Sequence, residues 1–179
     1  MDFSKELGER LRLPDIRRLC GMASGTCNDS VKEALYVCVF NSNDRISYNA
    51  LWVFSYFSSA DIVWLYEKKD GLVDLLLSTL HTGKRRLLLT LLERFPDTGI
   101  RADYLDYCLS MINSTEPHAI RALCLKQAYA QCCSCPELLA EFKEVLSMME
   151  DSFMSPAIRS ARRKVMHRMN SRARKSTEI

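Results

Sequence analysis

Apolar residues recur at helical spacing along almost the whole chain, and the strict apolar-polar alternation that is typical of strands is nearly absent. In the segment 155–169, for example, Ile158, Ala161, Val165 and Met169 fall on one face of a helix. A stripe of this kind packs against a neighbouring element, while the basic residues of the segment occupy the remaining faces. We therefore expect an all-α protein in which this basic segment is a packed helix and not a loose arm.

Four of the expected helices begin at residues that favour a first turn: Asp44, Thr82, Glu116-Pro117 and Ser155-Pro156. Asp, Ser and Thr side chains accept hydrogen bonds from the free N–H groups of a first turn, and proline loses no hydrogen bond there. The four starts are 38, 34 and 39 residues apart. This spacing indicates a repeated structural unit.

A second predicted helix precedes each of these starts, over residues 28–40, 61–80, 101–112 and 136–150. Two helices in every 35 to 45 residues are typical of an α-solenoid. We expect four helical hairpins. Residues 1–26 are expected to add one or two further helices, with an apolar side that consists of Leu7, Leu11, Ile16, Leu19 and Cys20.

The composition, with 47% hydrophobic and 26% charged residues, is that of a globular protein. We expect one domain over 1–170, followed by a basic, disordered tail over 171–179. The first residues mix acids and bases where a secretory leader needs an apolar stretch. No run approaches the roughly 20 apolar residues of a membrane span. We expect a cytoplasmic protein with no membrane partner.

Eight cysteines are present, most of them in apolar segments, where a free thiol behaves as a small hydrophobe. Cys132 and Cys135 form a single C-x-x-C pair, but a zinc site needs a second pair of ligands. The pair fits better at a helix end followed by a helix start, with Pro136 in the first turn. We expect no metal ion and no cofactor.

Two short stretches that open predicted second helices, AIRA at Ala119–Ala122 and AIRSA at Ala157–Ala161, resemble the second helix of HEAT repeats. The stretch from Asn49 to Phe95 resembles a complete step from one HEAT hairpin to the next. The similarity covers roughly residues 28–170. It implies a right-handed α-α superhelix, of the HEAT and armadillo type, whose second helices line a concave surface.

An aromatic stripe marks the predicted helix 44–58. The core face of this helix is expected to consist of Ile46, Ala50, Val53 and Phe57. Away from that face, Tyr48, Trp52 and Tyr56 are spaced at i, i+4 and i+8 among polar neighbours. Tyrosine and tryptophan are favoured contact residues in protein interfaces. The alternative is that a neighbouring hairpin or the N-terminal helices cover the stripe.

On the HEAT resemblance, one concave groove would hold the aromatic stripe and the basic residues of the second helices. The predicted binding residues are Tyr48, Trp52, Tyr56, Lys84, Arg86, Arg121, Lys126, Arg159 and Arg163. We expect a protein-protein interaction scaffold for an acidic protein or peptide. Because residues 155–179 carry a formal charge of +7, nucleic-acid binding through the second helices and the C-terminal end is the alternative.

Catalytic motifs are not apparent. The stretch STLHTGKRRL lacks the first glycine of a P-loop, and Arg85 stands where that motif needs Ser or Thr. The three histidines, His81, His118 and His167, have no nucleophile or acidic partner beside them in sequence. HEAT-like DNA glycosylases are a remote third possibility by fold analogy alone. We expect a protein that is not an enzyme.

Overall fold

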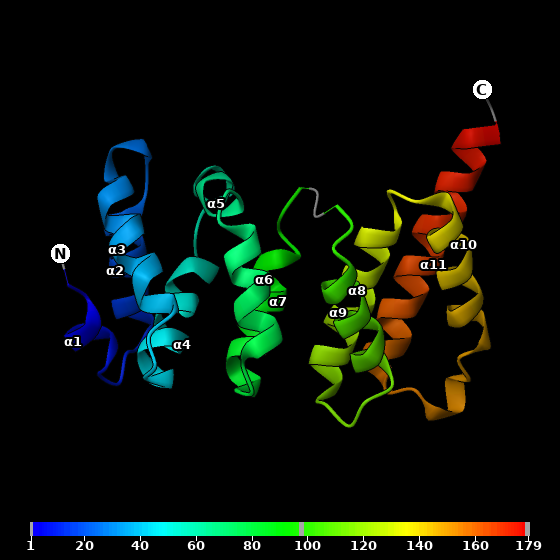
Figure 1. Cartoon of the computed structure of the whole chain (residues 1–179), viewed down its shortest axis with the longest axis horizontal. Helices are drawn as coiled ribbons and strands as arrows, with labels where there is room; N and C mark the ends of the chain where they lie inside the picture. The colour runs from blue at the N-terminus through cyan, green and yellow to red at the C-terminus, as the bar shows by residue number, and fades with distance from the viewer. Residues whose placement is uncertain (1, 97–98, 178–179) are drawn as a thin grey trace. The chain divides into compact units, whose positions relative to one another are not determined.

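The computed structural model describes residues 2–96 and 99–177 (Figure 1). Within these ranges the secondary structure consists of α-helices and two short 3-10 helices, with no strand. The prediction of an all-α protein is confirmed.

The chain forms two compact units, Met1–Phe95 (the first unit) and Pro96–Ile179 (the second unit). Helix α11 (Pro156–Thr177) continues to Thr177, through most of the segment expected to be a tail. The predicted limits of one domain over 1–170 and a disordered tail over 171–179 stay predictions.

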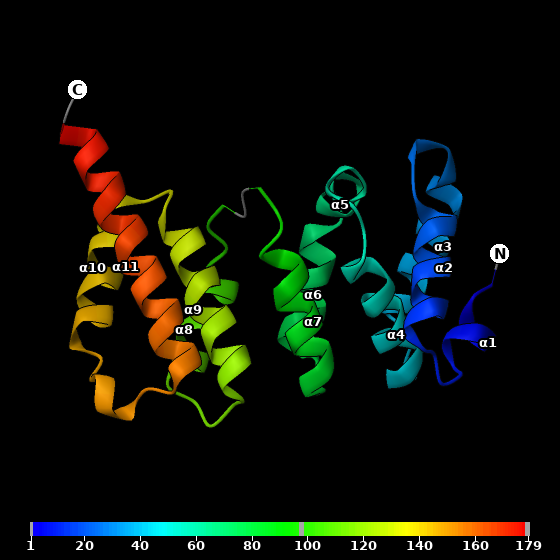
Figure 2. The same cartoon turned by 180° about the vertical axis from the view of Figure 1, so that it is seen from behind.

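The first unit is built around two helices, α4 and α7, that pack on each other. Helix α3 packs on α4, α6 packs on α7, and α1 and α2 also contact α4 (Figures 1 and 2). Its elements are α1 (Ser4–Leu7), α2 (Leu13–Ala23), η1 (Thr26–Asn28), α3 (Asp29–Val39), α4 (Asp44–Ser55), α5 (Ser59–Tyr66), α6 (Lys69–Ser78) and α7 (Thr82–Leu92).

The second unit repeats this arrangement. Helix α8 packs on α9, α10 contacts both α9 and α11, and the second helices α9 and α11 pack on each other. Its elements are α8 (Ala102–Ile112), α9 (His118–Cys132), α10 (Pro136–Met148), η2 (Asp151–Phe153) and α11. The four predicted hairpins are thus present as α3/α4, α5–α6/α7, α8/α9 and α10/α11.

The second helices begin within two residues of the predicted positions, and at α4, α7 and α11 a side chain caps the first turn. The Asn43 side chain accepts a hydrogen bond from the Arg45 N–H at 3.0 Å. At the start of α7, His81 Nδ1 accepts one from the Lys84 N–H at 3.2 Å. At these two helices the capping residue lies one position before the one predicted, whereas at α11 the predicted Ser155 accepts a hydrogen bond from the Ile158 N–H at 3.4 Å.

The prediction of one helix over 61–80 is wrong, because α5 ends at Tyr66 and α6 begins at Lys69. At the break, the Tyr36 hydroxyl donates a hydrogen bond to the Lys68 carbonyl at 3.3 Å. Helix α6 also lies close to Tyr36, since a Cβ atom on Gly71 would come within 2.6 Å of the tyrosine oxygen. A side chain of α3 therefore satisfies the backbone where the helix is interrupted.

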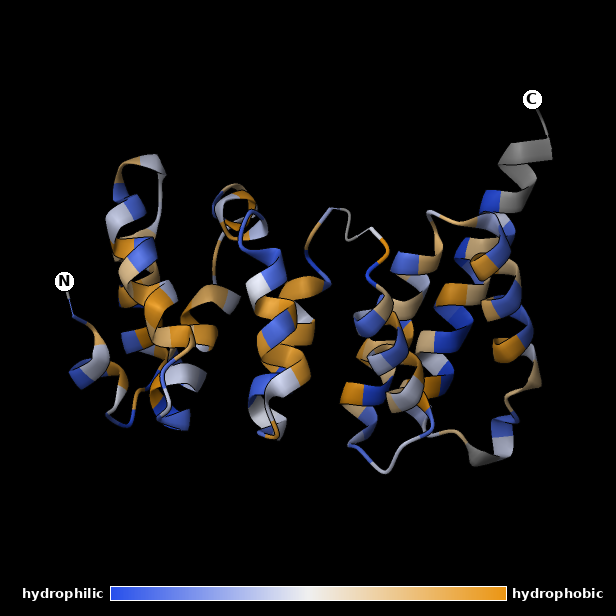
Figure 3. Ribbon diagram, viewed as in Figure 1, coloured by the Kyte–Doolittle hydropathy of each residue, from blue (hydrophilic) through white to orange (hydrophobic). Residues whose placement is uncertain are grey.

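The core of each unit lies between its packed helices. Figure 3 shows hydrophobic residues concentrated on α4 and α7, where Ala50, Leu51 and Leu88 are fully buried. In the second unit, the predicted stripe of α11 is confirmed as core, with exposed fractions of 5% or less. It consists of Ile158, Ala161, Val165 and Met169.

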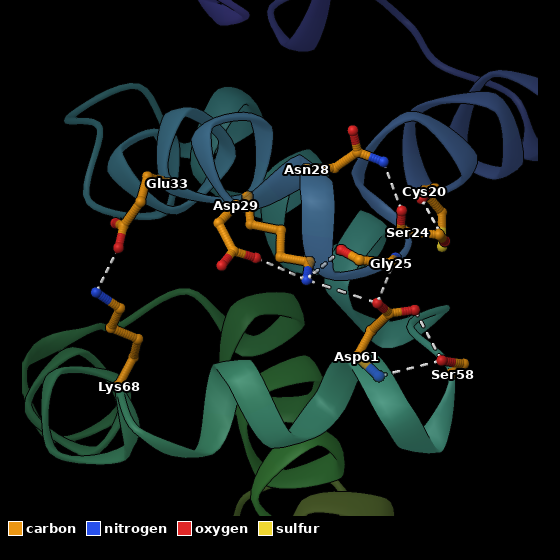
Figure 4. Close-up of polar contacts among 10 residues, drawn as sticks. Cys20, Ser24, Gly25, Asn28, Asp29, Glu33, Ser58, Asp61 and Lys68 are labelled. Carbon is orange, nitrogen blue, oxygen red and sulfur yellow. Dashed lines mark hydrogen bonds and ion pairs between the residues drawn. The ribbon is translucent and has the colours of Figure 1, made fainter.

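A buried ion pair connects α3, the turn before it and α5 (Figure 4). Lys32 is 3% exposed, and its Nζ lies 2.8 Å from the Gly25 carbonyl, 3.0 Å from Asp29 Oδ1 and 3.7 Å from Asp61 Oδ1. Asp61, which is 7% exposed, also accepts hydrogen bonds from the Gly25 N–H at 2.8 Å and from the Ser58 hydroxyl at 2.7 Å. A buried charge needs partners of this kind, so the cluster holds these elements in register.

Candidate functional site

The aromatic stripe of α4 is partly covered. Tyr48 and Trp52 are half-buried and Tyr56 is exposed. The Tyr48 and Trp52 ring centroids are 6.3 Å apart, and the His81 ring at the start of α7 lies 5.9 Å from that of Tyr48. The opposite face is core as predicted, because Ala50 and Val53 are fully buried. The stripe is therefore neither core nor a fully open surface.

A cleft of about 480 Å³ opens beside this stripe. We call it the Trp52 cleft, and its lining consists of Glu9, Arg10, Leu11, Arg45, Tyr48, Asn49 and Trp52. It combines an aromatic wall with two guanidinium groups and one carboxylate. This composition suits a ligand with both apolar and acidic groups.

The Trp52 cleft has a fixed wall because α4 holds the loop that follows α1. Asn49 is 5% exposed, and its amide donates to the carbonyls of Leu7 at 2.8 Å and Glu9 at 3.2 Å. Arg45 donates from the same helix to the Gly8 carbonyl at 3.5 Å. The loop is thus hydrogen-bonded in place before any ligand arrives. Sequence reasoning missed Arg10, Arg45 and Asn49 as site residues, because the cleft forms only where α4 meets a loop about 40 residues earlier in the chain.

Lys84 does not extend into this cleft. It is 6% exposed, and its Nζ lies 2.7 Å from Asp44 Oδ1 at the start of α4. The hydrogen bond from Lys84 and the charge of its ammonium group lower the pKa of Asp44. The pair links the starts of α4 and α7, so this predicted binding residue already has a partner within the first unit. Arg86 lies nearby on α7 and is exposed.

Arg121 also makes an internal contact. Its Nε donates to the Ile112 carbonyl, the last of α8, at 2.8 Å. Arg85 and Arg162 make equivalent bonds to the Thr79 and Leu146 carbonyls, at 2.9 and 2.6 Å.

In the first hairpin, the buried Ser47 hydroxyl donates to the Val39 carbonyl at 2.6 Å. In each hairpin, a side chain from the first two turns of the second helix thus donates a hydrogen bond to a backbone carbonyl near the end of the first helix. The last carbonyls of a helix have no N–H group within the helix to bond to. The arginine of AIRA therefore holds a hairpin together. The recurring polar residue near the start of each second helix was the sequence signal for this role.

The remaining basic candidates lie in the second unit. Lys126 is half-buried on α9, whereas Arg159 and Arg163 are exposed on α11. Arg159 and Arg163 border a cleft of about 620 Å³ together with Ser160, Met166 and others near the start of α11. Tyr48, Trp52, Tyr56, Lys84 and Arg86 belong to the first unit, so a single groove that unites all nine residues stays a prediction.

The cysteine pair shows no metal-binding geometry. Within residues 2–96 and 99–177, no group of three or more His, Cys, Asp or Glu side chains could hold a metal ion. Burial raises the pKa of Cys132 to about 11, so this residue is a thiol at neutral pH. Cys135 Sγ lies 3.1 Å from Glu137 Oε2.

The histidines occupy unrelated positions. His81 caps α7 and contacts Tyr48, and His118 and His167 lie on α9 and α11; all three are exposed. Over the described part of the chain, no helix is both long and apolar enough to cross a membrane.

Paired helices whose second members pack on one another define a helical repeat protein. A HEAT repeat domain model matches residues 3–169, nearly the whole chain, so the chain belongs to the HEAT repeat family. This confirms the predicted resemblance and extends it to the helices before residue 28. A comparison with curated proteins finds no match. HEAT repeat domains are helical scaffolds that often mediate protein interactions.

Proposed function

We propose that this HEAT repeat protein is a non-enzymatic scaffold that binds an acidic segment of another protein at the Trp52 cleft. One observation supports this most strongly: a partly exposed tryptophan lies in a cleft that Arg10 and Arg45 also line. Tryptophan and arginine are among the residues most enriched in the hot spots of protein interfaces. A carboxylate can pair with a guanidinium while an apolar side chain covers the indole ring.

Preorganisation favours this use of the cleft. Asn49 and Arg45 already hold the loop that forms one wall, so little conformational freedom is lost when a ligand binds. Tyr48 is in turn supported by His81. A rigid aromatic wall of this kind gives contact area at low entropic cost.

The nucleic-acid alternative has less support. It requires a stripe of exposed cations along the second helices, but Lys84 is buried and paired with Asp44, and Arg121 is half-buried with its Nε bonded to a backbone carbonyl. Of the exposed lysine and arginine residues on the second helices, only Arg45 and Arg86 lie on α4 and α7, and the others that the structure describes lie on α11. A footprint on one helix is smaller than the basic surface that nucleic-acid binding domains present.

The direct test is binding of a fluorescent acidic peptide of about 12 residues that contains one central phenylalanine, a length suited to a groove on a helical scaffold. Trp52→Ala should weaken binding more than tenfold, because truncation of a central interface aromatic costs about 2 kcal/mol or more. Phe40→Ala is the matched control, since Phe40 is 46% exposed in the same unit and lies outside the cleft. It should change the affinity less than twofold.

A salt titration separates the two functions. A duplex of about 20 base pairs that made six or more phosphate contacts would lose about a thousandfold or more in affinity between 50 and 200 mM salt. We expect the peptide to bind with a shallow salt dependence. Tight, steeply salt-dependent binding of the duplex, together with equal peptide binding by Trp52→Ala and the unmodified protein, would contradict the proposal.

A further inference from the structure

A further open surface of the second unit lies where the start of α10 lies beside the later part of α11. We call it the α10 groove. Its volume is about 390 Å³, and its lining consists of Cys133, Pro136, Leu139, Ala140, Lys143, Met169 and Arg172. The floor of the groove is mainly apolar. It is separate from the Trp52 cleft, which belongs to the first unit.

Helix periodicity explains the shape of the groove. Pro136, Leu139, Ala140 and Lys143 are spaced at i, i+3, i+4 and i+7, so they form one stripe over two turns of α10, about 10 Å long. Met169 supplies the matching surface of α11, with its side chain seated in the core at 5% exposure. This stripe lies apart from Phe142 and Leu146, which anchor α10 to its neighbours and are buried.

The charged residues that line the groove are cations. Its lining includes the cations Lys143 and Arg172 and no carboxylate. Arg172 and Arg168 also lie close enough to Tyr129 that their charges act on its hydroxyl. An apolar floor with a cationic rim is complementary to an apolar side chain that is flanked by carboxylates. Stacking platforms for nucleic-acid bases, by contrast, require aromatic side chains, which the lining lacks.

We propose that the α10 groove binds the apolar face of an acidic amphipathic helix from a partner protein. A leucine or phenylalanine of that helix occupies the groove, and glutamate or aspartate residues one turn away pair with Lys143 and are attracted by the nearby positive charge of Arg172. The volume accommodates one or two such side chains and is too open to enclose a long acyl chain. The inference rests on the proposed role as a scaffold but concerns a different surface.

The probe is a helical peptide of about 16 residues with two leucines four positions apart and glutamates on either side, a spacing that suits helix-in-groove recognition. Fluorescence anisotropy should show saturable binding. Replacement of both leucines by alanine should weaken binding more than tenfold, and replacement of the glutamates by lysine should abolish it.

Two variants of the full chain locate the site. Ala140→Phe places a bulky ring in the groove and should weaken peptide binding at least tenfold. Val145→Phe is the matched control, because Val145 is 45% exposed on a different face of α10, and it should change the affinity less than twofold. Lys143→Glu, which adds no bulk, should reduce affinity about fivefold, so the test does not depend on one variant. Circular dichroism should be used to check that each variant is folded.

Trp52→Ala should leave binding of this helical peptide unchanged. The proposal for the α10 groove can therefore fail while the proposal for the Trp52 cleft holds, and the reverse. The proposal is overturned if folded Ala140→Phe and Lys143→Glu both bind the peptide like the unmodified protein. It is also overturned if the alanine peptide binds as tightly as the leucine peptide. Saturable binding of decanoate at the groove without binding of the peptide would replace the proposed partner with a fatty acid.

Discussion

The buried pair of Lys32 and Asp61 gives the sharpest stability prediction. Asp61→Asn keeps the shape of the side chain and an oxygen that can accept the Gly25 N–H, but it removes the negative charge from beside a lysine that is 3% exposed. Loss of one partner from a buried ion pair typically costs 3 to 5 kcal/mol. Because Lys32 keeps the Gly25 carbonyl and the exposed Asp29 carboxylate, we expect a loss of about 2 to 3 kcal/mol.

Tryptophan fluorescence during urea denaturation is the appropriate assay. Both tryptophans of the chain, Trp52 and Trp64, lie in the first unit, so the signal reports on the unit that contains the pair. Asp29→Asn is the control, because Asp29 is largely exposed and should contribute less than about 1 kcal/mol. A loss below about 0.5 kcal/mol for Asp61→Asn would refute the account of this cluster.

The same pair predicts a pH dependence. Burial by itself raises the pKa of Asp61, but hydrogen bonds from Ser58 and the Gly25 N–H, together with the Lys32 charge, hold this pKa below its ordinary value. A carboxyl group whose folded-state pKa is lowered contributes stability above its unfolded-state pKa, near 4, and loses it as the pH falls through the folded value. The stability difference between the unmodified protein and Asp61→Asn should therefore shrink below about pH 4.

Two further predictions concern the second unit. Arg121→Ala should lower the free energy of unfolding by about 1 kcal/mol, because the hydrogen bond to the Ile112 carbonyl is lost. Arg159 is exposed, so Arg159→Ala should change this free energy by less than about 0.5 kcal/mol. Equal losses of stability in thermal melts of the two variants would contradict the role of Arg121 in the hairpin. Cys132, whose pKa burial raises to about 11, should react with iodoacetamide at pH 7 much more slowly than the exposed Cys27. Peptide mapping by mass spectrometry measures the alkylation rate of each cysteine, and similar rates for the two would contradict this prediction.

The helical fold could be predicted because its signals are local. Helical periodicity and first-turn residues define segments of about 10 to 20 residues, and the second helices that begin at Asp44, Thr82 and His118 follow them. The break between α5 and α6 could not be predicted in this way. It depends on Tyr36, a residue of another helix that reaches the Lys68 carbonyl.

The candidate site could be predicted only in part, for a related reason. The core face of α4 follows from spacing alone, but the exposure of Trp52 depends on how the loop at Arg10 is held by Asn49. Charge alone was also a poor guide. Lys84 and Arg121 are basic residues of the kind found on binding surfaces. Within the fold, however, Lys84 pairs with Asp44 and Arg121 donates to the Ile112 carbonyl.

The central claim, that an acidic segment binds against Trp52, is tested most directly by the two indole N–H signals in a ¹H–¹⁵N correlation spectrum of the full chain. Trp64 is an internal reference, because its ring lies 6.4 Å from that of the fully buried Phe54 in a stacked arrangement. Addition of the phenylalanine-containing acidic peptide should shift the Trp52 signal in a saturable manner and leave the Trp64 signal in place. A Trp52 signal that does not move at saturating peptide, while backbone amides of α11 shift, would contradict the account.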